Sequence, residues 1–212
     1  MSRVLPVLFN TEMVRATLEG RRSCISLKIP IDIVNNCDVE TDGTLLSYEN
    51  NYGDFIKPVK LCQYQPGDIL YVRETWKKAP NGYYYYEDWQ RNDIADITKW
   101  KPSIHMPKEA ARIWLKVTDV RVERLQEITE EQACMEGTDP WDEACYENNG
   151  WHPTFSDPDS GGDPNMIDGF HKLWDSTINK SDIDRYGWGA NPWVWVIEFE
   201  RCKKPEEDKR CD

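Results

Sequence analysis

The sequence has no long hydrophobic run and little histidine, and 30% of its 212 residues are charged. A membrane-spanning helix needs ~20 consecutive apolar residues, and no stretch of the chain approaches that length. This excludes an integral membrane protein. The N-terminus reaches Asn10 and Glu12 before an apolar segment of signal-peptide length forms. We therefore expect an unexported, cytoplasmic protein.

The seven cysteines are odd in number and include no C-x-x-C pair, which indicates neither a disulfide framework nor a zinc ribbon. The three histidines show no pair at metal-ligand spacing. Cys134, Cys145 and His152 could converge on zinc in principle, but their spacing matches no common zinc pattern. We expect no metal and no cofactor.

The net charge of -12 argues against wholesale wrapping of nucleic acid, but the charge is unevenly distributed. Residues 1–31 hold five basic and two acidic residues, and residues 97–125 hold seven basic and three acidic ones. Residues 126–175 hold thirteen acidic residues and one lysine. If the two basic segments meet, they form a positive face suited to a small anion or a short nucleic-acid segment. The alternative is ordinary solvated surface charge.

Hydrophobic periodicity and turn residues predict a mixture of strands and short helices. Strands are expected at 4–9, 69–76, 82–86, 112–125 and 193–201, and helices at 10–20, 129–137 and 166–176. The last strand is apolar on both faces, which indicates a central position in a sheet. The second helix is favoured by a capping box from Thr129 to Gln132, with Gly137 closing it.

Two segments read as insertions rather than core. Residues 35–60 are rich in Asn, Asp and Gly and predict a loop or loose hairpin. Residues 138–165 form a long insertion whose two tryptophans favour an ordered flap. The charged tail 203–212 is expected to be disordered. We expect a single domain over 1–202, α+β in class, with about five or six strands in a small barrel or curved sheet.

Several stretches resemble the ASCH domain of the PUA-like superfamily, and more closely its phage-borne branch. The matching stretches are PVLFNTEMVRATLEGRR, QPGDILYVRETW, KWKPSIHMPKEAARIWLKVTDVRVERLQEITEEQA, LWDS and GWGANPWVWVIEFER. The resemblance covers nearly the whole chain. It implies a small PUA-like β-barrel flanked by short helices with long loop insertions, in a protein acting in the host cytoplasm.

The resemblance also implies a cleft between the barrel and the first helix that binds RNA, a nucleotide or a modified nucleobase. One bacterial branch of the family removes the acetyl group of 4-acetylcytidine with a Lys, a Thr and a Glu. Carried over, the Glu falls on Glu136, whereas Arg22 and Ile25 replace the Lys and the Thr.

These replacements leave the activity open. An arginine stays charged and orients or stabilises an anion instead of acting as a base, and isoleucine has no nucleophile. Ser23 or Cys24 could supply one, and a neighbouring guanidinium would favour a thiolate. The candidate catalytic residues are therefore Glu136, Arg22, Cys24 and Ser23. Glu136 could instead be a surface carboxylate near a helix end.

Candidate ligand-binding residues begin with Arg21 and Arg22, whose planar guanidinium groups can each hold two phosphate oxygens. Arg73 and Trp76 come next, with the indole stacking a base or, alternatively, packing in the core. Glu74 could pair with Arg73 or Arg22, or face solvent.

Further candidates lie beside Pro102 and Pro107 and directly before Pro192. Pro102 and Pro107 should present Lys101, Ser103 and His105 on an extended segment. His105 is the histidine best suited to acid–base work, but a structural hydrogen bond or a contact with solvent is the favoured interpretation. Asn191 could read a base edge or simply initiate a turn.

Three functions remain open: a module binding RNA, a nucleotide or a modified nucleobase, an amidohydrolase or ribonuclease using the same cleft, and an acidic inhibitor of a host protein. The sequence indicates neither the ligand's identity nor an oligomeric state.

Overall fold

The computed structural model describes residues 2–39, 45–50, 52–90, 99–138 and 166–205. Its contacts divide the chain into two compact units. The first unit comprises Met1–Gly20, Tyr64–Asp119 and Phe199–Asp212, and the second comprises Arg21–Gln63 and Val120–Glu198. The expectation of one domain over 1–202 stays a prediction. No helix of the described residues combines the length and apolarity needed to cross a membrane.

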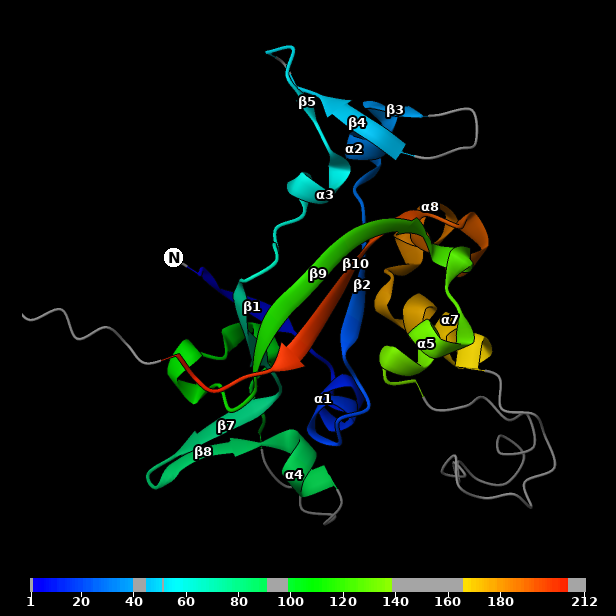
Figure 1. Ribbon diagram of the computed structural model, residues 1–212. Coiled ribbons are helices and arrows are strands. Elements are labelled where there is room, and N and C mark those ends of the chain that lie inside the picture. Colours follow the sequence, from blue (N-terminus) through cyan, green and yellow to red (C-terminus); the bar gives the residue numbers. More distant parts are fainter. Residues whose placement is uncertain (1, 40–44, 51, 91–98, 139–165, 206–212) are drawn as a thin grey trace, which may run out of the picture. The chain divides into compact units, whose positions relative to one another are not determined.

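The largest sheet has five strands in the order β1-β6-β9-β10-β2 (Figure 1). Its strands are β1 (Val4–Leu8), β6 (Ile69–Arg73), β9 (Trp114–Arg124), β10 (Trp193–Arg201) and β2 (Cys24–Lys28). The pair β1–β6 is parallel, whereas β6–β9 and β10–β2 are antiparallel. The α+β class is thus confirmed, as is the central position of β10. The described residues show no closure of this sheet into a barrel.

The first unit adds short elements to β1, β6 and the first part of β9. They are α1 (Thr11–Leu18), β7 (Trp76–Ala79), β8 (Gly82–Tyr85), α4 (Tyr86–Gln90), η2 (Ser103–His105) and η3 (Lys108–Ala110). The side chain of Asn10 accepts a hydrogen bond from the Met13 amide at 2.8 Å and thereby caps α1. A hydrophobic cluster lies under β7 and β8, formed by Trp76, Met106, Ala110, Ala111 and Trp114.

The second unit carries most of the helices. They are α2 (Ile31–Asn35), α3 (Pro58–Leu61), η4 (Leu125–Glu127), α5 (Glu130–Met135), α7 (Met166–Thr177), η5 (Lys180–Asp182), α8 (Ile183–Tyr186) and η6 (Trp188–Ala190). The helices α5 and α7 lie against each other (Figure 1). Their shared core is formed by Leu125, Ala133, Met166, Phe170, Trp174, Val194 and Val196. The predicted capping box of α5 is confirmed, since Thr129 and Gln132 exchange hydrogen bonds.

Residues 35–60 were predicted as a loop or loose hairpin, and the structure agrees with the hairpin alternative. They contain a three-stranded sheet in the order β3-β4-β5, built from β3 (Cys37–Val39), β4 (Leu45–Glu49) and β5 (Phe55–Ile56). Some of the polar residues that suggested a loop form the turn between β4 and β5. Asn50 Oδ1 accepts the amides of Tyr52 and Asp54, and Gly53 adopts a φ of +81°.

The strand predicted over 69–76 ends at Arg73, and Trp76 begins a new strand. The amide of Trp76 donates to the Lys101 carbonyl. A hydrogen bond to a residue distant in the sequence therefore helps to begin β7 instead of extending β6. The segment around His105 is a 3-10 helix rather than extended, because the His105 amide donates to the Pro102 carbonyl. Pro102 already has a φ of -58°, which suits the start of a helix.

The turn between Tyr64 and Ile69 is held by a charged contact. Asp68 is buried, which raises the pKa of its carboxyl, but hydrogen bonds from Arg3 and from the Gln65 amide outweigh burial and hold that pKa below its usual value. A carboxyl with a lowered pKa stabilises the folded state above its ordinary pKa, and this stabilisation is lost as the pH falls through the folded value.

We therefore expect the stability difference between wild type and Asp68→Asn to be largest near neutral pH and to shrink below about pH 4. Urea unfolding of both proteins between pH 3 and pH 7 measures it. A difference that stays constant over this range would contradict the assignment.

Candidate functional site

Arg22 and Glu136 form a buried ion pair in the second unit. The Nη2 atom of Arg22 donates to Glu136 Oε2 at 2.8 Å, and Nη1 donates to the Glu136 backbone carbonyl. The two side chains are 1% and 3% exposed. Their backbones also pair as an isolated bridge, which joins the segment before β2 to the C-cap of α5. Glu136 is therefore not the surface carboxylate considered from the sequence.

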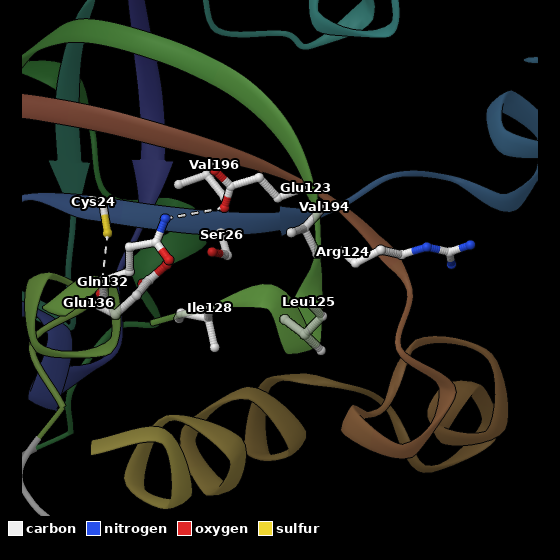
Figure 2. A pocket seen from close by; sticks show the side chains of 10 residues that line it. All are labelled: Cys24, Ser26, Glu123, Arg124, Leu125, Ile128, Gln132, Glu136, Val194 and Val196. Atoms are coloured by element: carbon white, nitrogen blue, oxygen red, sulfur yellow. Dashed lines mark hydrogen bonds between the residues drawn. The ribbon is translucent and has the colours of Figure 1, made fainter. Parts of the chain in front are cut away.

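A narrow pocket lies beside this pair (Figure 2). Its lining comes from β2, β9, β10, α5 and the segments next to them, and consists of Cys24, Ser26, Glu123, Arg124, Leu125, Ile128, Gln132, Glu136, Val194 and Val196. None of these residues belongs to α1, the helix expected to border the cleft. The cavity volume is about 10 Å³, close to the least that one water molecule needs.

The β2 strand presents two polar side chains to this pocket. Cys24 and Ser26 are two residues apart and share one face of the strand, whereas Ile25 points to the other face. The Cys24 thiol donates to the backbone carbonyl of Gln132 at 3.9 Å, and the side-chain Nε2 of Gln132 donates to Glu123 Oε2 at 3.3 Å (Figure 2). Three polar residues of the lining, Cys24, Gln132 and Glu123, are thus linked by hydrogen bonds. The lining also includes the apolar side chains of Leu125, Ile128, Val194 and Val196.

Burial raises the pKa of Glu136, because loss of solvent disfavours the carboxylate more than Arg22, Ser26 and Cys24 together favour it. Glu136 Oε1 is buried and receives no hydrogen bond of good geometry from the described residues, although Ser26 lies close enough to lower the pKa. A carboxyl with a raised pKa binds a proton more readily than an exposed carboxyl does. The site therefore offers a polar atom with hydrogen-bonding capacity to spare.

Burial likewise raises the pKa of the Cys24 thiol, with Glu136 adding to the shift and Arg22 opposing it more weakly. The Arg22 guanidinium favours the thiolate as expected, but desolvation is the larger effect and outweighs it. Cys24 is a neutral thiol in this pocket rather than an activated nucleophile.

The remaining candidates in the second unit contribute to local structure. Arg21 donates to the Gly137 carbonyl at 3.1 Å. The Ser23 amide donates to the Met135 carbonyl, and the Ser23 side chain does not line the pocket. Asn191 adopts a left-handed φ of 45°, and its side chain accepts the Gln126 amide at 2.8 Å. The turn-forming alternative for Asn191 thus agrees with its contacts.

Arg22 was expected to hold phosphate, and the structure assigns it a different partner. Its guanidinium group is buried and already donates hydrogen bonds to both the carboxylate and the backbone carbonyl of Glu136. A phosphate could reach this guanidinium only after the ion pair opened.

Arg73, Glu74 and Trp76 lie in the first unit with partners of their own. Arg73 Nε donates to the Met106 carbonyl at 2.8 Å. Glu74 is buried and pairs with Arg112 rather than with Arg73 or Arg22. Trp76 is 4% exposed and belongs to the hydrophobic cluster, so its ring packs in the core and does not present a free face for stacking.

Lys101, Ser103 and His105 follow in the same unit. Lys101 is exposed, and its Nζ lies 5.0 Å from the centre of the Trp76 ring. Ser103 is half-buried and His105 is exposed on the 3-10 turn. None of the three lines the pocket beside Arg22 and Glu136.

Sequence reasoning missed Ser26 and Gln132 as pocket residues. The signal that could have found Ser26 is the alternation of strand side chains, which places it on the same face as Cys24. Gln132 was recognised for its capping role alone, although the same residue also faces the pocket.

The described residues contain no cluster of three potential metal ligands. Cys145 and His152 lie outside them, as do residues 139–165 of the predicted flap. Comparison with family models, with curated proteins and with solved structures gives no match, so the site is interpreted from its geometry.

Proposed function

We propose that the protein binds a nucleobase, as a nucleotide, a modified nucleoside or part of an RNA, at the pocket beside Arg22 and Glu136. The observation that carries this proposal is the buried ion pair itself. An apolar pair of similar volume would fold as well or better, and perturbed carboxyl groups concentrate at functional sites. A folding role alone gives no reason to keep these charges in the interior.

The pocket's chemistry suits the edge of a base. A carboxylate can accept a hydrogen bond from an exocyclic amino group such as that of cytosine, and a hydroxyl such as that of Ser26 can both donate and accept. Glu136 and Ser26 together provide such groups. The apolar side chains of Ile128, Val194 and Val196 provide surface for a ring.

Entry of a base requires the pocket to widen, because its present volume suits a single water molecule. The half-buried side chains on its rim are Glu123, Arg124, Ile128 and Gln132. Arg124 extends away from Glu136 (Figure 2). We expect a ligand to enter by displacing these side chains, while Arg22 and Glu136 stay in place. The proposal includes the PUA-like barrel implied by the family resemblance.

The binding experiment is calorimetric titration with cytidine, 4-acetylcytidine, uridine, adenosine, guanosine and their 5′-monophosphates. We expect at least one of them to bind, and Ser26→Ala to weaken that ligand by about twofold to tenfold, the value of one hydrogen bond. Glu136→Gln should weaken it by about tenfold or more, as a hydrogen bond to a charged group is stronger. Ile25→Val, on the other face of β2, is the matched control.

Binding unaffected by Ser26→Ala and Glu136→Gln would overturn the proposed site. Failure of folded wild-type protein to bind any member of the panel would overturn the proposed function. Thermal unfolding of each variant beforehand ensures that folded proteins are compared.

An amidohydrolase acting on acylated pyrimidine nucleosides is the second candidate, favoured by the raised pKa of Glu136. In that reaction water adds to the acyl carbon, the C–N bond breaks, and a proton reaches the departing nitrogen. Glu136 could take the proton from water and deliver it. Mass spectrometry of the same panel, with Glu136→Gln beside wild type, tests for turnover.

A further inference from the structure

The first unit contains two segments that are basic and free of acidic residues. Residues 75–86 and 99–108 hold no Asp or Glu in a chain of net charge -12. Their five lysines are Lys77, Lys78, Lys99, Lys101 and Lys108. None of these five forms an ion pair with a described residue. Positive charge therefore outweighs negative charge within the two segments, with Glu109 at their border accepting a hydrogen bond from the Tyr83 hydroxyl at 3.4 Å.

The fold brings the two segments together. The Trp76 amide donates to the Lys101 carbonyl at 3.2 Å, and the Lys101 amide donates to the Trp76 carbonyl at 2.8 Å. The hairpin β7–β8, which extends from this contact, pairs Lys77 with Tyr84 and Lys78 with Tyr83 (Figure 1). Lys78, Lys99 and Lys101 are exposed.

Aromatic rings alternate with these lysines. Lys78 Nζ lies 5.6 Å from the centre of the Tyr83 ring, and Lys101 Nζ lies 5.0 Å from that of Trp76. Tyr83 and Tyr84 are both half-buried, so part of each ring is accessible to solvent. Lysines that form no ion pair with a described residue, beside accessible rings, are typical of surfaces that hold single strands, where lysines track phosphates and rings stack bases.

We infer that β7, β8 and residues 99–108 form a binding surface for a single-stranded polynucleotide. An acidic peptide would use the lysines but gain little from the tyrosines, whereas a polynucleotide uses both. This surface lies in the first unit and shares no residue with the pocket of the second. The inference therefore goes beyond the proposed function and does not require it.

The test is fluorescence anisotropy of the full chain with labelled 12-nucleotide oligouridylate and oligothymidylate between 50 and 200 mM salt. We expect binding that weakens with salt. Each lysine that neutralises a phosphate of a single strand contributes about 0.7 to the slope of log affinity against log salt. The triple variant Lys77→Ala, Lys78→Ala, Lys101→Ala should lower that slope by about 2. Tyr84→Ala should weaken binding about fivefold or more through lost stacking.

The matched control removes the same charge from exposed lysines of the second unit, as Lys57→Ala, Lys60→Ala, Lys180→Ala, and should leave the slope unchanged. Comparing the two oligonucleotides distinguishes RNA from DNA as the ligand. Three results would overturn the inference: no binding by wild type at 50 mM salt, equal losses in both triple variants, or competition by polyglutamate as effective as by an unlabelled oligonucleotide. Nucleoside binding at the Arg22 pocket, measured on the hairpin variants, should not change, so the two proposals can fail separately.

Discussion

Replacing Glu136 by Gln destabilises the protein by about 3–5 kcal/mol at every pH from 5 to 8, the usual cost of removing one partner of a buried ion pair. The variant leaves the guanidinium of Arg22 buried without its counter-charge. An arginine does not lose its proton at any pH in this range. The cost therefore cannot be relieved by titration.

The reciprocal variant Arg22→Met behaves differently. It leaves the Glu136 carboxyl buried, and burial has already raised its pKa. A carboxyl whose pKa is raised on folding stabilises the folded state most at low pH, and this stabilisation is lost as the pH rises through the folded pKa. We expect Arg22→Met to cost less at pH 5 than at pH 8, because its buried carboxyl takes up a proton more readily in acid.

The double variant Arg22→Met, Glu136→Met provides the control. Replacing both charges by apolar groups of similar volume should recover most of the lost stability, while abolishing nucleoside binding if the pocket acts as proposed. Urea unfolding at pH 5 and pH 8, followed by tryptophan fluorescence, measures all four proteins. Costs below about 1 kcal/mol for both single variants would show instead that the pair behaves as an exposed one.

Arg112 permits a second comparison, because one guanidinium holds a buried and an exposed carboxylate. Its Nε and Nη2 atoms donate to Glu74 at 2.9 and 2.8 Å, and Nη1 donates to both oxygens of Asp88 at 2.8 Å. The Glu74 side chain is 3% exposed, whereas that of Asp88 is 48% exposed. The two contacts have similar distances and differ mainly in burial.

We expect Glu74→Gln to cost about 3 kcal/mol, at the lower end of the range for a broken buried pair because Arg112 keeps Asp88. Asp88→Asn should cost less than about 1 kcal/mol, as an exposed pair contributes little. Chemical unfolding of the two isosteric variants at neutral pH measures the difference. Equal costs, or a larger cost for Asp88→Asn, would contradict the view that burial decides the strength of this network.

Much of the local structure could be predicted from the residues alone. The start of α1 near Asn10, the capping box of α5 and the strand patterns of β9 and β10 rest on interactions within a few residues, and all were confirmed. Within 35–60 the sequence left a loop and a loose hairpin open, because the same polar residues serve loops and hairpin turns.

The candidate site was predicted in part. The family resemblance selected Arg22 and Glu136, which the structure places in contact. It carried the nucleophile position onto Ile25, whereas Ser26 is the residue that faces the pocket. A shift of one residue along a strand moves a side chain to the opposite face, so an alignment without the fold cannot decide between neighbours.

By itself, the sequence determined where α1, α5 and α7 begin and which strand is buried on both faces, because these depend on side chains close together in the chain. Only the tertiary structure decided that Arg22 meets Glu136 and that Glu74 meets Arg112, pairs separated by 114 and 38 residues. It also decided that Cys24 stays a thiol. Ionisation and pairing depend on which distant groups exclude water from a side chain and which charges then remain beside it, and neither can be inferred from positions along the chain.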